Sequence, residues 1–192
     1  HQIERILDAL HKNYNLSRKL EVTLECNPEG LSLKKLVDFK SVGVNRLSLG
    51  FQSLDDNILK VLSREHSSSQ CISSYRYARD AKFDNINIDL IYSVPKQNKK
   101  VWLSTLSRVI DLGPDHVSCY SLTVEKNTKL HSMVQNNLIS MPSQDIDYEM
   151  FSITRDTLIK NRYNQYEISN FSKNDKECLH NLHYWMLDPY LA

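Results

Sequence analysis

The chain has 192 residues, of which 41% are hydrophobic and 24% charged, so it is long enough for one folded domain with a sizeable core. Its formal net charge of +1 argues against a strongly basic surface that would bind nucleic acid or an anionic membrane. No apolar run approaches the roughly 20 residues that span a bilayer, and no signal peptide is recognisable.

The cysteines and the chain ends indicate the compartment and the extent of the protein. Four cysteines are spread along the chain without a CxxC-type cluster: Cys26, Cys71, Cys119 and Cys178. We therefore expect reduced thiols in a reducing intracellular compartment. A helical pattern begins at His1, and the chain stops at Ala192 without a cap or tail, so we expect both ends to be cut from a longer protein.

Hydrophobic periodicity predicts alternating helices and strands in the first half of the chain. Apolar residues at positions i, i+3, i+4 and i+7 predict helices, whereas alternating apolar and polar residues predict strands. In chain order we expect a helix over 1–10, a strand over 21–26, a helix over 33–43, a strand over 46–50, a helix opened by the capping sequence Ser53–Asp56 and reaching Leu62, a helix over 67–82 opened by Ser67 and Gln70, and a strand over 86–91.

The second half continues this alternation. We expect a helix over 101–112 ended by Gly113-Pro114, a strand over 117–122, a helix over 145–160, and a fifth strand or extended segment over 163–171. Strands separated by helices pair in parallel through right-handed crossovers. The order therefore fits an α/β fold, either a doubly wound sheet or a (β/α) barrel.

The two faces of the first three predicted strands differ in character. One face is aliphatic and carries Val22, Leu24, Leu47, Leu49, Ile86, Ile88 and Leu90. The other is polar and carries Thr23, Glu25, Arg46, Ser48, Asn87 and Asp89. Strands covered by helices on both faces are apolar on both, and unpaired buried charges are costly. We therefore expect an open or partial barrel with a polar, ligand-filled lumen, the alternative being an ordinary α/β sheet with one exposed face.

Polar side chains stand at the C-terminal ends of successive strands, where α/β barrels bind their ligands. Glu25, Gln52 and Asp89 occupy this rim, and Arg64 follows one helix later and can return to it. Glu25 could accept an ammonium group, Arg64 could pair with a carboxylate, and Asp89 could accept hydrogen bonds from two ribose hydroxyls. The set suits an amino-acid nucleoside such as S-adenosylmethionine. The alternative is an internal ion pair between Glu25 and Arg64.

A series of motifs resembles, in matching order, the HemN/HemW branch of the radical SAM superfamily. The motifs are Glu25–Pro28 (ECNP), Gly43–Ser53 (GVNRLSLGFQS), Leu62–His66 (LSREH), Asn87–Ile91 (NIDLI), Tyr120–Glu125 (YSLTVE) and Tyr166–Phe171 (YEISNF). The resemblance extends over about 21–185, nearly the whole chain. A long ordered set of motifs is more specific than any single motif.

The resemblance implies a fold and a set of cofactors. The fold is a partial (β/α)6-type radical SAM barrel with about four parallel strands over 1–126, followed over 127–192 by the start of a C-terminal region. The cofactors are S-adenosylmethionine and a [4Fe-4S] cluster, whose electron cleaves the cofactor to a 5′-deoxyadenosyl radical. The implied S-adenosylmethionine contacts are Glu25 with the amino group, Gln52 with the ribose and methionyl part, Arg64 with the carboxylate, Asp89 with the ribose, Ile91 with the adenine, and Thr123 with the nucleoside through its backbone.

The chain departs from the family pattern in three places. The CxxxCxxC loop that binds the cluster is missing, so the cluster cysteines lie outside this chain, and we expect them a few tens of residues before His1. The glycine-rich stretch after the second barrel strand is missing too. Ser93 and Lys96 stand where family members commonly have glycine.

The run His180–Trp185 (HNLHYW) resembles the HNxxYW heme-binding signature of HemW and its mitochondrial relatives. The resemblance implies His180 as a ligand of heme iron, with Tyr184 and Trp185 against the porphyrin. The alternative is a packed histidine beside aromatic residues. A zinc site built from Cys178, His180 and His183 lacks a fourth ligand.

The expected function is therefore that of a radical SAM heme chaperone, which binds heme and passes it to heme-dependent proteins such as respiratory-chain components. We expect no nucleic-acid partner, and membrane association only through the partner proteins. The compartment would be mitochondrial in a eukaryote and cytoplasmic in a bacterium, and the motif spacing is closer to that of the mitochondrial relatives. The alternatives are an oxygen-independent coproporphyrinogen III oxidase of porphyrin biosynthesis and an α/β scaffold without cofactor chemistry.

Overall fold

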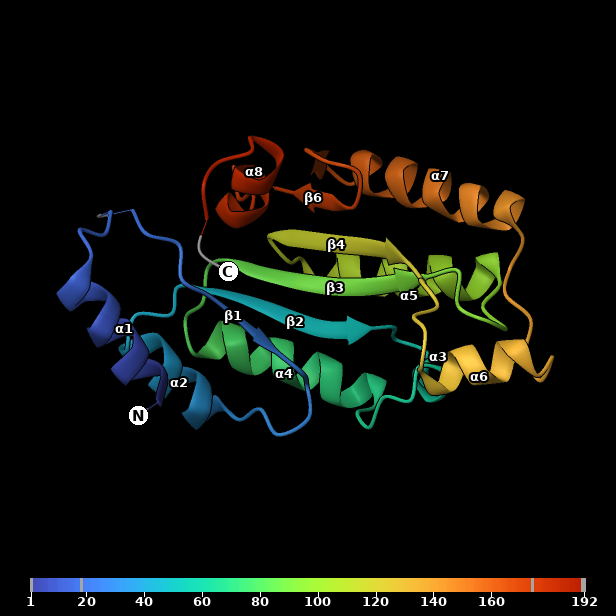
Figure 1. Ribbon diagram of the computed structural model, residues 1–192, viewed down its shortest axis with the longest axis horizontal. Helices are drawn as coiled ribbons and strands as arrows, with labels where there is room; N and C mark the ends of the chain where they lie inside the picture. The colour runs from blue at the N-terminus through green and yellow to red at the C-terminus, as the bar shows by residue number, and fades with distance from the viewer. Residues whose placement is uncertain (1, 18, 174, 191–192) are drawn as a thin grey trace.

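The computed structural model describes residues 2–17, 19–173 and 175–190, and a six-stranded sheet runs through it in the order β1-β2-β3-β4-β6-β5 (Figure 1). The first four strands are parallel, and β6 and β5 are antiparallel additions at the β4 edge. The strands are β1 (Thr23–Cys26), β2 (Arg46–Gln52), β3 (Ile86–Tyr92), β4 (His116–Ser121), β5 (Asn164–Gln165) and β6 (Asn170–Ser172). The predicted α/β fold with about four parallel strands is confirmed.

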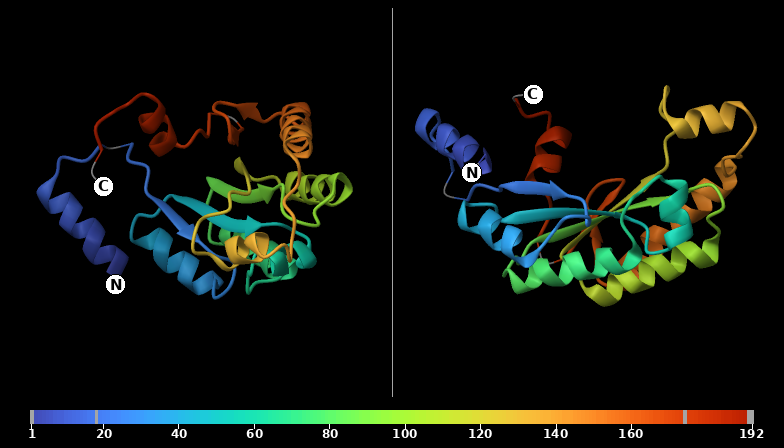
Figure 2. Two further views of the ribbon diagram at one scale, coloured as in Figure 1. Left: turned by 45° about the vertical axis from the view of Figure 1, so that its right-hand side comes forward. Right: turned by 90° about the horizontal axis from the view of Figure 1, so that it is seen from below.

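Helices connect the strands, and several of them cover one face of the sheet. They are α1 (Gln2–Asn13), α2 (Leu33–Ser41), α3 (Asp56–Val61), α4 (Ser68–Asp80), α5 (Lys99–Leu112), α6 (Lys129–Gln135), α7 (Gln144–Lys160) and α8 (Leu179–Trp185). The right panel of Figure 2 shows α2, α4 and α5 side by side on one face, whereas α1, α8 and α6 stand around the edges of the other. None of the helices in the described ranges has the length and apolarity needed to cross a bilayer.

The aliphatic and polar faces of the strands lie as the alternation predicts. Leu47, Leu49, Ile86, Ile88 and Leu90 are fully buried in the core beneath the helices. The polar side chains of these strands line a cavity on the opposite face, which α1, α8 and α6 only border. This face is therefore free to form a ligand site.

Side-chain caps fix the points at which several helices begin. Ser67 and Gln70 form the predicted capping box at the start of α4. The cap of α3 differs from the prediction, because Asp55 and not Ser53 accepts the first free backbone N–H groups of that helix. A carboxylate is also favoured by the positive end of the helix dipole, and Ser53 instead accepts a bond from the Asp55 N–H in the preceding turn.

In place of the fifth strand or extended segment expected over 163–171, the structure has two short antiparallel strands, β5 and β6. A turn between them is closed by side chains: Gln165 donates to the Ile168 carbonyl and Glu167 accepts from the Ser169 N–H. β6 then pairs antiparallel with β4 and runs back along it. This reversal brings the chain after 172 to the polar face, near the starts of the parallel strands (Figure 1).

Candidate functional site

The polar face of the sheet carries two adjoining cavities. The rim cavity, of about 350 Å³, lies at the C-terminal ends of the strands, and its lining includes Glu25, Asn27, Gly50, Gln52, Arg64 and Asp89. The face cavity, of about 390 Å³, extends towards the strand starts, and its lining includes Thr23, Arg46, Tyr120, Cys178, His180 and Asn181. Glu25, Ser48 and Asp89 line both. The volumes are in the range of small-molecule sites.

The rim cavity brings together Glu25, Gln52, Arg64 and Asp89, which were expected to share a rim. Glu25 is exposed and Arg64 half-buried. Among the described residues the ion pairs involve other side chains, so Glu25 and Arg64 do not neutralise each other. Both charges are therefore available to a ligand.

A bulge at the end of β2 shapes the wall of the rim cavity. The pairing with β3 shifts between Gly50 and Gln52, and Gln52 has a left-handed φ of 64°. A Cβ at Gly50 would lie 3.0 Å from Gln52 Nε2 and 3.1 Å from Asn27 Oδ1. Glycine therefore allows these two polar side chains to close in on the strand.

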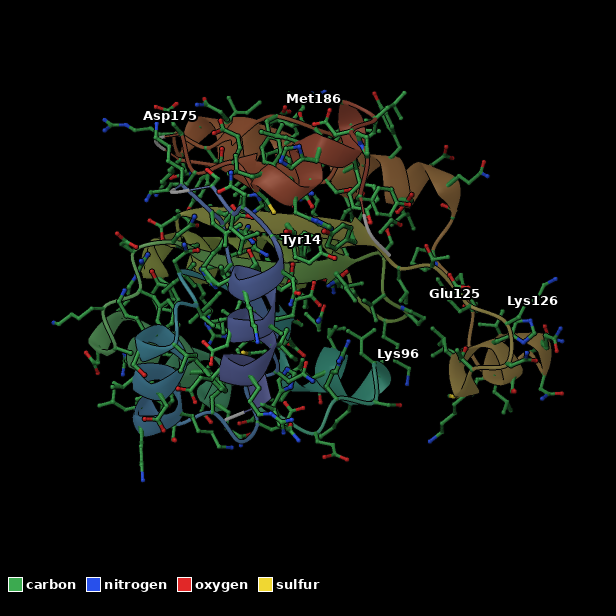
Figure 3. The ribbon with its side chains drawn as sticks, turned by 60° about the vertical axis from the view of Figure 1, so that its left-hand side comes forward. Tyr14, Lys96, Glu125, Lys126, Asp175 and Met186 are labelled. Carbon is green, nitrogen blue, oxygen red and sulfur yellow. The ribbon has the colours of Figure 1, made fainter. Side chains whose placement is uncertain are left out.

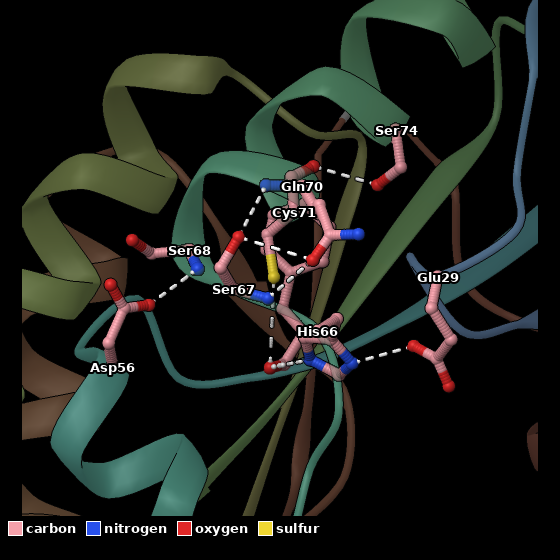
Figure 4. A network of polar contacts seen from close by, with 9 residues as sticks. Glu29, Asp56, His66, Ser67, Ser68, Gln70, Cys71 and Ser74 are labelled. Atoms are coloured by element: carbon pink, nitrogen blue, oxygen red, sulfur yellow. Dashed lines mark hydrogen bonds and ion pairs between the residues drawn. The ribbon is translucent and has the colours of Figure 1, made fainter.

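His66 fixes the turn that carries Arg64. The imidazole is buried, with Nδ1 2.8 Å from Glu29 Oε2 and Nε2 3.1 Å from the Phe51 carbonyl (Figure 4). Glu29 follows β1 and Phe51 belongs to β2, so one ring ties the α3–α4 turn to two strand ends. The Arg64 N–H adds a bond to the Leu59 carbonyl at 2.9 Å.

The Asp89 carboxylate is oriented by its neighbours on the sheet. The Ser48 hydroxyl donates to Oδ2 at 2.7 Å, and the Asn87 amide donates to Oδ1 at 2.8 Å. The same Asn87 nitrogen donates to the Ser48 hydroxyl oxygen at 2.7 Å. Each oxygen keeps a free lone pair, because a carboxylate accepts about four hydrogen bonds.

A hydrogen-bond chain runs from Asp89 to α8, and its direction follows from chemistry. A carboxylate only accepts, so Asn87 turns its amide nitrogen to Asp89 and its oxygen to His116 Nδ1, which donates at 2.7 Å. His116 Nε2 then accepts from the Tyr166 hydroxyl at 2.8 Å, and the Tyr166 oxygen accepts from the Asn181 amide at 3.2 Å. Every donor therefore faces Asp89.

His116 is neutral in this chain. Burial, followed by the charge of Arg46, lowers the pKa of His116 to about 3. A neutral imidazole has one donor and one acceptor, which is what Asn87 and Tyr166 require of it. His116 therefore has a structural role in the hydrogen-bond chain.

Helix α8 carries the HNLHYW run and places His180 at the face cavity. The His180 ring is exposed and meets Tyr184 edge-on, with ring centroids 4.8 Å apart. Trp185 is 58% exposed and lines neither cavity. Figure 3 shows Met186 at the outer side of this helix, and Glu125 and Lys126 on the segment towards α6.

The start of α8 is held by Glu21, which precedes β1. Its carboxylate accepts from the Leu179 N–H at 3.2 Å and from the Cys178 thiol at 3.4 Å. His183 bonds Asp188 at 2.6 Å instead of facing the cavity. In the part of the chain that the structure describes, no three His, Cys, Asp or Glu side chains are placed to hold a metal, so a zinc site at Cys178 and the two histidines has no support.

Two expected cofactor contacts lie away from both cavities. Ile91 is half-buried on β3, and Thr123 is exposed beyond the end of β4. Neither lines the rim cavity or the face cavity.

Ser93 and Lys96 keep the backbone shape that glycine favours, with φ of 58° and 69°. The Ser93 hydroxyl donates to Asp147 of α7 at 2.5 Å. The loop after β3 is therefore secured without glycine.

Sequence reasoning missed several lining residues. Gly50 could have been found, because glycine inside a strand often marks a close approach. Glu21 and Asn181 gave no such signal. Glu21 bonds Leu179, 158 residues away, and Asn181 bonds the hydroxyl of Tyr166, which in turn bonds His116, 50 residues away from it.

Comparison with known proteins identifies the family of the chain. The profile of the Radical SAM superfamily matches residues 1–109. The chain is 35% identical over 192 residues to the heme chaperone HemW of Bacillus subtilis, covering 100% of this chain and 51% of that protein. It is 37% identical to the mouse mitochondrial radical S-adenosyl methionine domain-containing protein 1, covering 100% of this chain and 43% of that protein.

A solved structure gives the same picture of the fold. The coproporphyrinogen III oxidase HemN from Escherichia coli, a radical SAM enzyme, superposes with a TM-score of 0.78 at 26% identity, covering 91% of this chain and 40% of that one. The chain thus spans about half the length, or less, of the relatives it matches.

Proposed function

Because the chain belongs to the radical SAM superfamily, we propose that it is part of a HemW-type heme chaperone, which binds heme and delivers it to heme-dependent proteins. The observation that carries the proposal is that His180 and Asp89 line one cavity, within a chain similar over its full length to proteins named heme chaperone HemW. The mitochondrial names of other relatives favour a mitochondrial location if the protein is eukaryotic. For a bacterial protein, the proposed location is the cytoplasm.

The donor set of the rim cavity suits S-adenosylmethionine. Glu25 would take the amino group, Arg64 the carboxylate, Gln52 the ribose and methionyl part, and Asp89 the ribose hydroxyls, for which it keeps free lone pairs. Ile91 and Thr123 would contact the adenine only if the bound cofactor extended beyond this cavity. In this superfamily the bound cofactor and a [4Fe-4S] cluster supply a radical. The chain has no CxxxCxxC sequence, so the cluster ligands are not assigned to it.

Helix α8 would hold the heme. The exposed imidazole of His180 is available as an axial ligand of the iron, and the ring of Tyr184 supports it edge-on. Trp185 is exposed on the same helix and offers an apolar surface to a porphyrin. Heme would then lie against the face cavity, beside the site proposed for S-adenosylmethionine.

The test is heme titration of the full-length protein, followed through the Soret band. We expect His180→Ala to lower heme affinity at least about tenfold and to shift the band, because an axial ligand is lost. His183→Ala is the matched control, since this second histidine of α8 bonds Asp188 and should leave the spectrum unchanged. Equal spectra for wild type and His180→Ala would refute the assignment.

Similarity to HemN supports a second candidate, a coproporphyrinogen III oxidase. The HNLHYW run favours the chaperone, because it resembles a signature that the oxidases lack. Incubating the cluster-loaded full-length protein with coproporphyrinogen III and S-adenosylmethionine separates the two. Sustained formation of protoporphyrinogen would favour the oxidase, and its absence together with heme binding would favour the chaperone.

A further inference from the structure

Helix α8 is attached to the sheet mainly through polar contacts. Its own residues are exposed or at most half-buried, so no fully buried side chain within the helix sets its position. Its first turn is held by Glu21 and by the Tyr166 hydroxyl oxygen, which accepts from the Cys178 N–H at 3.3 Å and from the Asn181 amide at 3.2 Å. Asn181 directly follows His180. The hydrogen bond between Asn181 and Tyr166 therefore helps to set the position of His180.

Tyr166 is also the last residue before α8 in the hydrogen-bond chain that starts at Asp89. Its hydroxyl donates to His116, His116 donates to Asn87, and Asn87 donates to Asp89. Hydrogen bonds aligned head to tail polarise one another, so each is strengthened by the next. A change in what Asp89 accepts is consequently felt at the Tyr166 oxygen.

We infer that Tyr166 is a positioning residue that couples the two cavities, so that a ribose bound at Asp89 loosens α8 and weakens its hold on heme. Ribose hydroxyls that donate to the free lone pairs of Asp89 draw electron density from the carboxylate, so that Ser48 and Asn87 donate to a weaker acceptor. The weaker Asn87 bond lowers the polarisation of the bonds behind it, and Tyr166 becomes a poorer acceptor for Asn181. This inference rests on the proposed function and adds its regulation: nucleoside binding favours heme release.

Linkage makes the coupling measurable from either ligand. Heme affinity of the full-length protein is measured with and without saturating S-adenosylmethionine, and we expect about a fivefold weakening in wild type. Tyr166→Phe keeps the ring but removes the hydroxyl, so its heme affinity should no longer respond. Tyr77→Phe is the matched control, because Tyr77 is an exposed tyrosine on α4 and should respond as wild type does.

A conservative change separates coupling from simple structural damage. Glutamine at position 116 offers one donor and one acceptor, as neutral imidazole does, so His116→Gln should keep the response, whereas His116→Leu should lose it. No response in wild type, a tighter hold on heme, or an unchanged response in Tyr166→Phe would each overturn the inference.

A second readout works without heme, so that failure of the proposed function can be distinguished from failure of the coupling. Trp185 on α8 is 58% exposed, while the other tryptophan, Trp102, is fully buried in the core. S-adenosylmethionine should change the fluorescence of wild type but not that of Trp185→Phe or Tyr166→Phe. If heme does not bind, the chaperone proposal fails, and the fluorescence change alone tests the coupling. A change that depends on Tyr166 supports the coupling, and no change overturns it. If S-adenosylmethionine does not bind, Asp89→Asn replaces it as the perturbation, judged in the same way.

Discussion

His116 gives a pH test of the buried hydrogen-bond chain. Burial, with a smaller effect of the Arg46 charge, lowers the pKa of His116 to about 3 in the folded protein, against about 6.5 in an unfolded chain. Below about pH 6.5 the unfolded state takes up a proton that the folded state does not bind. Stability contributed by the neutral ring is therefore complete above that pH and is lost as the pH falls towards about 3.

The loss can be calculated from linkage. Between about pH 7 and about pH 5 an unfolded histidine goes from mostly neutral to almost fully protonated, while folded His116 stays neutral. Integrating the difference in bound protons gives a loss of about 2 kcal/mol in unfolding free energy. Replacing His116 with glutamine removes this titration and keeps one donor for Asn87 and one acceptor for Tyr166.

Urea unfolding followed by circular dichroism at these two pH values measures the effect. Wild type should lose about 2 kcal/mol more than His116→Gln over the interval, because the other titrating groups are common to both proteins and cancel. An equal loss in the two proteins would show that His116 is not held neutral. The order of donors and acceptors assigned to the hydrogen-bond chain would then lose its basis.

Two further substitutions follow from close packing and from burial. Gly50→Ala should weaken S-adenosylmethionine binding about tenfold in calorimetry, since the added Cβ displaces Asn27 and Gln52, while stability changes by less than about 1 kcal/mol. Gly113→Ala should instead lower stability and leave S-adenosylmethionine binding unchanged, because the left-handed φ of 73° is strained for alanine but no atom lies near the added Cβ. Equal losses of binding in both variants would contradict this. Arg46→Met should raise the urea midpoint, because Arg46 is 3% exposed and its Nε has no partner among the described residues, and a lowered midpoint would contradict that description.

Those parts of the fold that depend on local pattern could be predicted from the sequence. The alternation of Leu47 and Leu49 with Arg46 and Ser48 was enough to separate the core face of β2 from its polar face. Ser67 and its helix cap were readable because a capping box needs only four consecutive residues.

The rim residues could be grouped for a related reason. Parallel strands start and end at the same edges of a sheet, and Asp89, in the middle of β3, pairs with Gly50, so Glu25, Gln52 and Asp89 come close together once the strands are known. The family resemblance then supplied a ligand, which neither charge nor spacing could specify.

Two features escaped prediction for physical reasons. β5 and β6 have two and three residues, too few to show an alternation, and their pairing depends on a turn closed by Gln165 and Glu167. The chain through Tyr166 and His116 joins residues 50 positions apart, and no local pattern reports such a contact.

The contact between Glu21 and the start of α8 has a consequence for the order of folding. It joins Glu21 to Leu179, 158 residues away, across nearly the whole chain. Closing so long a loop costs more chain entropy than the neighbouring pairings of β1 to β4, and few contacts of α8 repay it early. We expect the sheet to form first and α8 to dock last. The helix proposed to carry heme would then dock onto a polar sheet face that has already folded.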